Sequence, residues 1–265
     1  MNYKLLVGLF LLAIACQDTP KQVDKMDATE KLQKQIATDT YPENFLKVLD
    51  AHGGLETWKT YNTLGFDLPK PDFTETHTID LSRRLDKITA SSFSLGYDGT
   101  DVWLLDSLST YEGNPIFYHN LMFYFYAMPF VLADKGINYE ETKPLEVAGV
   151  SYPGFKISFD TGVGTSSKDE YYLHYDAATF KMNWLGYTVT YFSNTASDKI
   201  SWINYGDWIE VEDVLLPSAI TWYTVENAKI AGPAKTVNFE NVRLSKKSKP
   251  ITFYTRPEAA SIIKE

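Results

Sequence analysis

Cys16 is the residue whose type and surroundings point most directly to a chemistry. It is the only cysteine in the 265 residues, and it follows Ala13-Ile14-Ala15 directly. A small-x-small triplet before a cysteine is typical of a lipobox, in which the chain is cut before the cysteine and the thiol is acylated. We therefore expect Cys16 to begin the mature chain and to carry a lipid.

The residues before Cys16 support this prediction. Lys4 gives a positively charged start, and residues 5–14 form an unbroken apolar run. A membrane-spanning helix needs about 20 apolar residues, whereas the core of a signal peptide needs roughly 7 to 15. Residues 1–15 are therefore predicted to be a lipoprotein signal peptide. The expected location is the cell envelope, on the outer membrane, at its periplasmic face or at the cell surface. The alternative is an ordinary secretory signal with an incidental cysteine.

Acylation limits the chemistry left to the mature chain. A sulfur held in a thioether cannot form a disulfide, bind a metal or act as a nucleophile, so mechanisms based on cysteine are excluded. The net charge is −9, and no basic run occurs in the sequence. Such a surface repels nucleic acid and anionic headgroups. We expect no nucleic-acid partner and membrane contact only through the lipid on Cys16; the sequence leaves protein partners open.

The histidines show no metal signature. They are His52, His77, His119 and His174. None lies three or four residues from another, so we predict no metal site and no cofactor. Glu75 and His77 share one face of a strand, which fits a carboxylate and a base, but an ordinary polar strand face is the favoured interpretation. His52, before Gly53-Gly54, is expected to close a helix with a partly charged imidazole at the negative end of the helix dipole.

The loop of residues 160–170 is rich in glycine and acidic residues. Asp160, Asp169 and Glu170 could together bind Ca²⁺, but the loop lacks alternating acidic ligands, and a hairpin connection is favoured.

No serine elbow, phosphate-binding glycine loop or zinc helix occurs in the sequence, so no enzyme activity is predicted. Four tryptophans on predicted strands keep a carbohydrate-binding or hydrolytic protein as an alternative. They are Trp184, Trp202, Trp208 and Trp222.

The chain divides into a tether and one folded domain. Residues 16–40 are polar and cannot bury enough apolar surface to fold alone, so we interpret them as a tether. Residues 41–265 form the predicted domain, which begins with a helix after Pro42 and a stop at Gly53-Gly54. The apolar positions at helical spacing in it are Phe45, Val48 and Leu49.

After residue 63 the pattern is that of β-strands. Asp98-Gly99 between two alternating apolar runs predicts a hairpin. Further strands are predicted at residues 74–81, 152–159, 170–175, 184–192, 200–209, 216–225 and 237–244. Many strands joined by short turns indicate a mainly β, α+β fold, with a single curved antiparallel sheet that forms an open half-barrel.

Residues 114–132, called the aromatic segment below, interrupt the strand pattern. The segment is aromatic on almost every side, and Pro129 is expected to kink or end its helix. With His119 and Asn120 inside it, the segment is too short and too polar for a membrane span. Other elements must therefore cover it, and the concave face of the curved sheet is the natural place.

Two motifs carry a resemblance to a known superfamily. Residues 45–59, FLKVLDAHGGLETWK, and the hairpin GYDGTDVWL at residues 96–104 resemble the periplasmic lipoprotein-carrier superfamily. From about residue 41 onward the chain also resembles a family of bacterial lipoproteins catalogued as a domain of unknown function. The resemblance implies an open half-barrel with helices as a lid and a cavity that takes acyl chains. Shuttling members of that superfamily lack a lipid anchor, so the predicted acylation of Cys16 favours a lipid-binding or anchored-acceptor role.

We therefore expect the aromatic segment to be a helical lid that contacts a lipid or acyl chain. The predicted ligand-contacting residues are Phe117, Phe123, Tyr124, Tyr126, Met128 and Phe130. Aromatic and methionine side chains line apolar pockets, but they also fill cores. An envelope scaffold with a filled core is therefore the second hypothesis. An apolar cavity of several hundred Å³ would favour the lid, and a fully packed interface would favour the scaffold.

Overall fold

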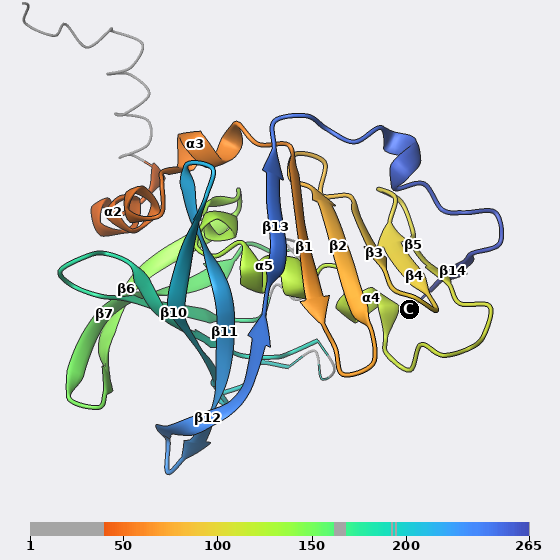
Figure 1. The fold of residues 1–265 in the computed structure, drawn as a ribbon. Helices are drawn as coiled ribbons and strands as arrows, with labels where there is room; N and C mark the ends of the chain where they lie inside the picture. The colour runs from red at the N-terminus through yellow and green to blue at the C-terminus, as the bar shows by residue number, and fades with distance from the viewer. Residues whose placement is uncertain (1–39, 162–167, 192, 194, 265) are drawn as a thin grey trace, which may run out of the picture. The chain divides into compact units, whose positions relative to one another are not determined.

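The computed structural model describes residues 40–161, 168–191, 193 and 195–264 (Figure 1). Cys16, the predicted signal peptide and the predicted tether up to residue 39 lie outside the described residues, and what is predicted for them stays a prediction. Among the residues that are described, no helix is long and apolar enough to cross a membrane.

Two helices open the domain, and the first lies where the spacing predicts it. α2 (Glu43–Ala51) begins after Pro42 and buries three apolar side chains. α3 (Leu55–Lys59) follows Gly54 and buries Trp58. The buried side chains of α2 are those predicted to lie on one helix face: Phe45, Val48 and Leu49.

Seven strands form a first sheet, sheet A, in which all neighbours are antiparallel. In spatial order they are β13 (Glu240–Ser245), β1 (Thr63–Pro69), β2 (Thr74–Asp80), β3 (Asp86–Thr89), β4 (Ser94–Tyr97), β5 (Val102–Leu105) and β14 (Ser261–Ile263). The predicted hairpin at Asp98-Gly99 is confirmed, since it joins β4 to β5, and Gly99 supplies a φ of 100° in the turn.

Seven further strands form sheet B, again with antiparallel neighbours. In spatial order they are β12 (Lys229–Asn238), β11 (Val214–Glu226), β10 (Ser201–Val211), β9 (Met182–Tyr187), β8 (Tyr171–Tyr175), β7 (Val150–Phe159) and β6 (Ile137–Val147).

The chain passes between the two sheets twice, through the aromatic segment from β5 to β6 and directly from β12 to β13. β12 lies at an edge of sheet B and leads directly into β13 at an edge of sheet A (Figure 1). Phe239 lies between them and packs on Phe66 and Tyr126, at ring-centroid distances of 5.3 and 4.2 Å. Within the described residues neither sheet closes on itself. The predicted mainly β, α+β class with an open antiparallel arrangement is confirmed. The strands form two sheets, where a single sheet was predicted.

The double glycine attaches α2 to sheet B. Gly53 has a φ of 104°, and a Cβ on it would lie 2.3 Å from the carbonyl oxygen of Asp213 in the turn between β10 and β11. The carbonyl of His52 accepts a 2.9 Å hydrogen bond from the N–H of Leu215. Only glycine allows this backbone conformation at so close an approach. The glycines therefore end the helix and also let it dock on a hairpin.

Polar residues stand on the buried face of sheet A. In the β1–β2 register, Phe66 pairs with His77 and Leu68 pairs with Glu75. Glu75 is 4% exposed and His77 is 1% exposed. The expectation of an ordinary polar strand face is therefore wrong for these two residues. A buried charge needs partners, and the aromatic segment supplies one of them, the Tyr118 hydroxyl.

Candidate functional site

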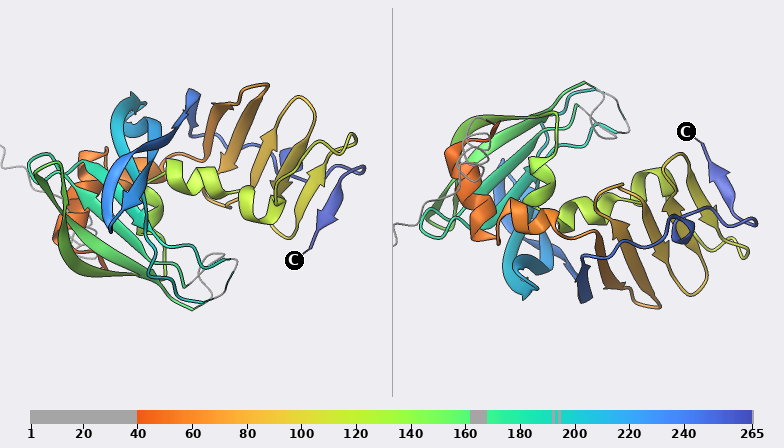
Figure 2. Two further views of the ribbon diagram at one scale, coloured as in Figure 1. Left: turned by 90° about the horizontal axis from the view of Figure 1, so that it is seen from below. Right: turned by 90° about the horizontal axis from the view of Figure 1, so that it is seen from above.

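The aromatic segment folds as two short helices and a 3₁₀ turn. α4 (Pro115–Tyr118) begins after Asn114, whose side-chain oxygen accepts a 3.2 Å hydrogen bond from the N–H of Phe117. α5 (Leu121–Tyr126) follows, and η1 (Phe130–Ala133) begins directly after Pro129. The helix is therefore interrupted before Pro129, as expected. Figure 2 shows α4 and α5 along one face of sheet A.

The first attachment of the segment to sheet A is through Tyr118. Its hydroxyl donates a 2.6 Å hydrogen bond to the carboxylate of Glu75. The ammonium group of Lys70 lies 3.2 Å from the same carboxylate and 3.1 Å from the Tyr118 hydroxyl. The anion on the buried sheet face is thus held by a phenol from the segment and a cation from the loop after β1.

Two further polar contacts hold the segment. His119 Nδ1 lies 2.6 Å from the carboxylate of Asp86 on β3. At the other end, Nη2 of Arg84 lies 2.6 Å from both carboxylate oxygens of Asp134, just after η1. The segment is therefore fastened to sheet A at both ends by charged groups.

Three of the six predicted ligand-contacting residues lie in the core. Phe130 stacks on Trp58 with ring centroids 4.7 Å apart and planes 4° from parallel. Tyr126 packs on Phe66 and Phe239, and the ring of Phe123 lies under the guanidinium of Arg84 at 5.2 Å. All three side chains are buried: Phe123, Tyr126 and Phe130.

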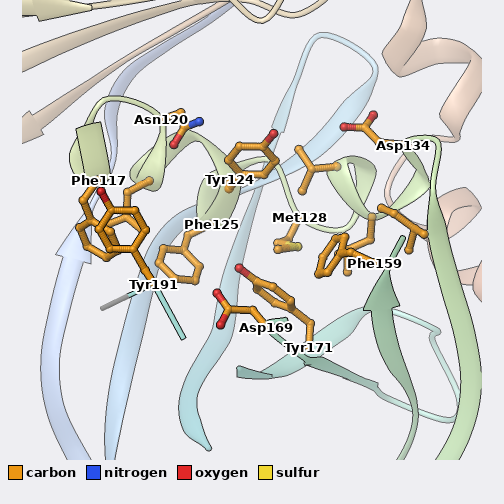
Figure 3. Close-up of a pocket in the computed structure, with 14 residues that line it drawn as sticks. Phe117, Asn120, Tyr124, Phe125, Met128, Asp134, Phe159, Asp169, Tyr171 and Tyr191 are labelled. Atoms are coloured by element: carbon orange, nitrogen blue, oxygen red, sulfur yellow. The ribbon is translucent and has the colours of Figure 1, made fainter. Parts of the chain in front are cut away.

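The other three predicted residues line a cavity between the aromatic segment and sheet B. Phe117, Tyr124 and Met128 belong to this group (Figure 3). The cavity has a volume of about 140 Å³. The remaining lining residues are Asn120, Leu121, Phe125, Val131, Leu132, Asp134, Ile137, Phe159, Asp169, Tyr171 and Tyr191. It is called the apolar cavity below.

Sequence reasoning missed the sheet B wall of the apolar cavity. Ile137, Phe159 and Tyr171 come from β6, β7 and β8, which are adjacent in sheet B. Strands were predicted close to β7 and β8, but nothing in the sequence indicated that these strands meet the aromatic segment. β6 was not predicted at all.

Two carboxylates lie in the lining of the apolar cavity. Asp134 is paired with Arg84, whereas Asp169 accepts a 2.6 Å hydrogen bond from the N–H of Thr190. Burial raises the pKa of both carboxyl groups above the usual range. Among the described residues that line the cavity there is no lysine, arginine or histidine. The electrostatic character of the cavity is therefore negative.

A second cavity, of about 360 Å³, lies on the other side of η1. It is lined by Leu55, Trp58, Lys59, Tyr61, Asn62, Leu81, Ser82, Arg84, Phe130, Ala133, Asp134 and Lys135. Polar and charged side chains make up much of this wall, so it does not offer an alkyl chain a continuous apolar surface. Phe130, predicted to touch the ligand, faces this polar cavity.

The two carboxylate–histidine pairs are shut inside the protein. His77 Nε2 lies 3.3 Å from Glu75, and burial lowers the pKa of His77. Burial opposes the charge of Glu75, but hydrogen bonds from His77 and Tyr118 hold its pKa below the usual value. Asp86 is 2% exposed and His119 is 9% exposed. General acid–base catalysis needs a group within hydrogen-bond reach of a substrate, and none of these residues lines either cavity.

His52 is the C-terminal cap of α2, but it is not charged. Its Nδ1 lies 2.7 Å from the carbonyl of Val48, and the ring packs edge-on against Trp208. Burial lowers the pKa of His52 to about 4. The prediction of a partly charged imidazole at the helix end is therefore wrong, because desolvation outweighs the helix dipole here.

The three loop carboxylates have separate partners. Asp160 accepts a hydrogen bond from Asn138, and Glu170 pairs with Lys156 at 2.7 Å. Asp169 turns instead toward Thr190 and the apolar cavity. Within the described ranges, which omit residues 162–167, no three metal-ligating side chains come together.

The tryptophans do not form an exposed platform for sugars. Trp184 is 4% exposed, so its ring is not available at the surface to stack on a sugar. Trp222 packs on Phe125 and donates a hydrogen bond of 2.9 Å to the hydroxyl of Tyr187. These rings serve mainly to pack sheet B.

Comparisons with known proteins give matches only among solved structures. No protein-family model and no curated protein matches the chain. A LolA superfamily protein from Nitrosomonas europaea is 8% identical with a TM-score of 0.47, and the match covers 79% of this chain and 96% of that one. A DUF1329 family protein from Desulfovibrio piger is 9% identical with a TM-score of 0.45, over 74% and 91% of the two chains.

A third match is a domain from Vibrio parahaemolyticus named as an outer membrane lipoprotein-sorting protein. It is 10% identical with a TM-score of 0.38, over 73% of this chain and 93% of that one. These three structures are what the chain is similar to, and they assign no ligand to it.

Proposed function

We propose that the chain is a lipid-anchored envelope protein that binds the hydrocarbon chain of a lipid or other amphiphile between the aromatic segment and sheet B. The observation that carries the proposal is the apolar cavity, in which six of the fourteen lining residues are aromatic. Apolar walls with a few polar groups are typical of ligand pockets. Anchoring rests on the lipobox at Cys16, and the outer membrane is the proposed location.

The size of the apolar cavity defines how much of a ligand it holds. Pockets that enclose a whole drug-sized ligand measure roughly 300–1,000 Å³. This cavity measures about 140 Å³, which is smaller than the several hundred Å³ expected for a lid that covers a whole acyl chain. An apolar void of that order is large enough for a ring such as benzene. Leu121 and Tyr124 in its wall are only partly buried. The proposed ligand therefore inserts one part of its hydrocarbon chain, and the rest lies outside the wall.

A filled-core scaffold is the second candidate. Phe123, Tyr126 and Phe130 support it, because they are packed in the core and do not line the apolar cavity. An enzyme is the weakest candidate, because the acid–base pairs Glu75–His77 and Asp86–His119 are enclosed away from both cavities. Binding without catalysis is therefore proposed.

A neutral alkyl probe separates binding from a filled core. We would titrate the purified full chain with decyl maltoside below its micelle concentration, using calorimetry, and record native mass spectra for co-purified lipid. Saturable binding of one molecule is expected. Absence of any bound alkyl compound in both measurements would overturn the proposal and favour the scaffold.

A substitution that fills the cavity gives the matched control. Leu121→Trp adds a large ring at the wall, so it should weaken probe binding at least tenfold while the melting temperature changes little. Leu108→Trp makes the same change at a side chain that is 71% exposed and outside the cavity. It should leave both quantities unchanged. Equal effects of the two variants would place the probe elsewhere on the surface.

A further inference from the structure

The charges of the apolar cavity restrict the head group of the ligand. Asp134 and Asp169 are its only charged lining residues among those described. Lys168, which directly precedes Asp169 in the chain, is not among the lining residues. Arg84 approaches both oxygens of Asp134 at 2.6 Å, so that carboxylate is already neutralised. Asp169 is left as the carboxylate that determines the charge of the cavity.

Within the described part of the chain, Asp169 accepts a hydrogen bond but forms no ion pair. The N–H of Thr190 donates a 2.6 Å hydrogen bond to one of its oxygens. Among the ion pairs of the described residues, none includes Asp169. Burial raises its pKa, as expected for a carboxylate whose charge is not compensated. A partly buried anion of this kind attracts a cation more strongly than an exposed one does.

The rings around Asp169 suit the same kind of partner. Figure 3 shows the Asp169 carboxylate pointing into the cavity beside Tyr171. Phe117 and Tyr191 lie with ring centroids 5.1 Å apart, and Phe159 meets Tyr171 edge to face at 5.5 Å. Aromatic faces attract alkylammonium groups, and proteins bind such groups in cages of aromatic rings.

We propose that the ligand of the apolar cavity is an amphiphile whose head is an ammonium group, held by Asp169 and the surrounding aromatic rings. The inference rests on the proposed binding function and adds the class of head group. A free fatty acid or an alkyl sulfate would bring a second anion to Asp169, with no cation in the described lining to offset it. The cavity therefore selects against anionic amphiphiles.

Three probes of equal chain length test this inference: decyltrimethylammonium, decyl sulfate and decyl maltoside. Each is titrated below its micelle concentration into the purified full chain at physiological salt, which screens the net charge of −9. Decyltrimethylammonium should bind at least tenfold more tightly than decyl sulfate. This comparison uses only the wild-type chain, so it holds even if a variant fails to fold.

Asp169→Asn keeps an oxygen that can accept the Thr190 hydrogen bond and removes the charge. It should weaken decyltrimethylammonium binding about tenfold and leave decyl maltoside binding unchanged. Asp160→Asn removes the same charge from an exposed residue outside the cavity and should behave as wild type. This control separates a local effect from the net charge of the protein.

The outcomes distinguish the two levels of the proposal. If decyl maltoside binds, but decyl sulfate binds as tightly as decyltrimethylammonium, the ammonium inference is wrong and hydrophobic binding stands. The same conclusion follows if Asp169→Asn and Asp160→Asn have equal effects on decyltrimethylammonium. If none of the three probes binds, the proposed function itself fails.

Discussion

The hydroxyl of Tyr118 on α4 lies 2.6 Å from the carboxylate of Glu75 on β2, and this hydrogen bond joins the aromatic segment to the interior of sheet A. Glu75 is 4% exposed, so water cannot replace the phenol there. Burial and the nearby Glu75 charge raise the pKa of Tyr118, which therefore stays protonated and remains a donor. The segment is thus held by a polar contact in a largely apolar interior.

Tyr118→Phe should destabilise the protein by about 1.5–3 kcal/mol, because it removes a hydrogen bond to a buried charged group. Urea unfolding measures this loss. Tyr172→Phe is the matched control, since its hydroxyl donates a 2.7 Å hydrogen bond to Glu170 in a partly exposed position. Water can replace that bond, so the control should lose about 0.5 kcal/mol or less. Equal losses in both variants would contradict a special role for the Tyr118 contact.

Local sequence patterns were sufficient to predict most of the elements. Pro42 and Gly53-Gly54 bracket α2 because proline favours the first helical turn and these glycines adopt positive φ. The Asp98-Gly99 turn is confirmed for the same kind of reason. These predictions needed only residues that are close together in the chain.

Long-range contacts account for what the sequence did not predict. The predicted strand at residues 237–244 is divided at Phe239, where the chain passes from sheet B to sheet A. Nothing local distinguishes a straight strand from one that changes sheets. The position of Asp169 in the apolar cavity likewise depends on β8 meeting the aromatic segment, more than 30 residues away in sequence. The density of aromatics correctly predicted burial but did not separate core from cavity.

Phe130→Ala should cost about 3–5 kcal/mol in the free energy of unfolding, the usual loss for a large ring removed from a core. The ring is 1% exposed and stacks on Trp58. Since Phe130 does not line the apolar cavity, the folded fraction should bind decyl maltoside as wild type does. Urea unfolding and calorimetric titration measure the two effects.

Tyr124→Ala is the matched change within the apolar cavity. Tyr124 is only partly buried, so its truncation should cost less stability than Phe130→Ala but weaken probe binding severalfold. The two variants thus give opposite patterns of stability and affinity. A loss of probe affinity in folded Phe130→Ala equal to that in Tyr124→Ala would contradict the boundary drawn between core and cavity.

His52 should make the protein less stable in mild acid. Its pKa is about 4 in the folded state because of burial, against a usual value near 6.5 in the unfolded chain. The unfolded state therefore binds a proton first as the pH falls. The stability contribution is complete above about pH 6.5 and declines by about 1.4 kcal/mol per pH unit down to about pH 4.

The comparison of wild type with His52→Leu isolates this effect from other titrating groups. Leucine fills a similar apolar site beside Trp208 and does not titrate. Between pH 6.5 and 4.5, wild type should lose roughly 2–3 kcal/mol more than the variant, as measured by urea unfolding at each pH. Parallel pH profiles of the two proteins would mean that folding does not lower the pKa of His52.

Cys16→Ala should release the protein from the membrane. The reason is the Ala13-Ile14-Ala15-Cys16 sequence, which is typical of a lipobox. Without the thiol there is no attachment point for the lipid, so the chain should be recovered as a soluble or an unprocessed form. Cell fractionation with a salt wash, together with metabolic labelling by a fatty acid, measures both consequences.

Ser82→Ala, a polar-to-alanine change far from the signal segment in the sequence, serves as the control and should stay with the membrane fraction and incorporate label. If Cys16→Ala remains in the washed envelope fraction, another part of the chain or a partner protein holds it there. If wild type takes up no label, the cysteine is incidental and residues 1–15 act as an ordinary secretory signal.

Because the apolar cavity lies in residues 117–191, Cys16→Ala should still bind decyl maltoside with wild-type affinity, which would separate anchoring from ligand binding.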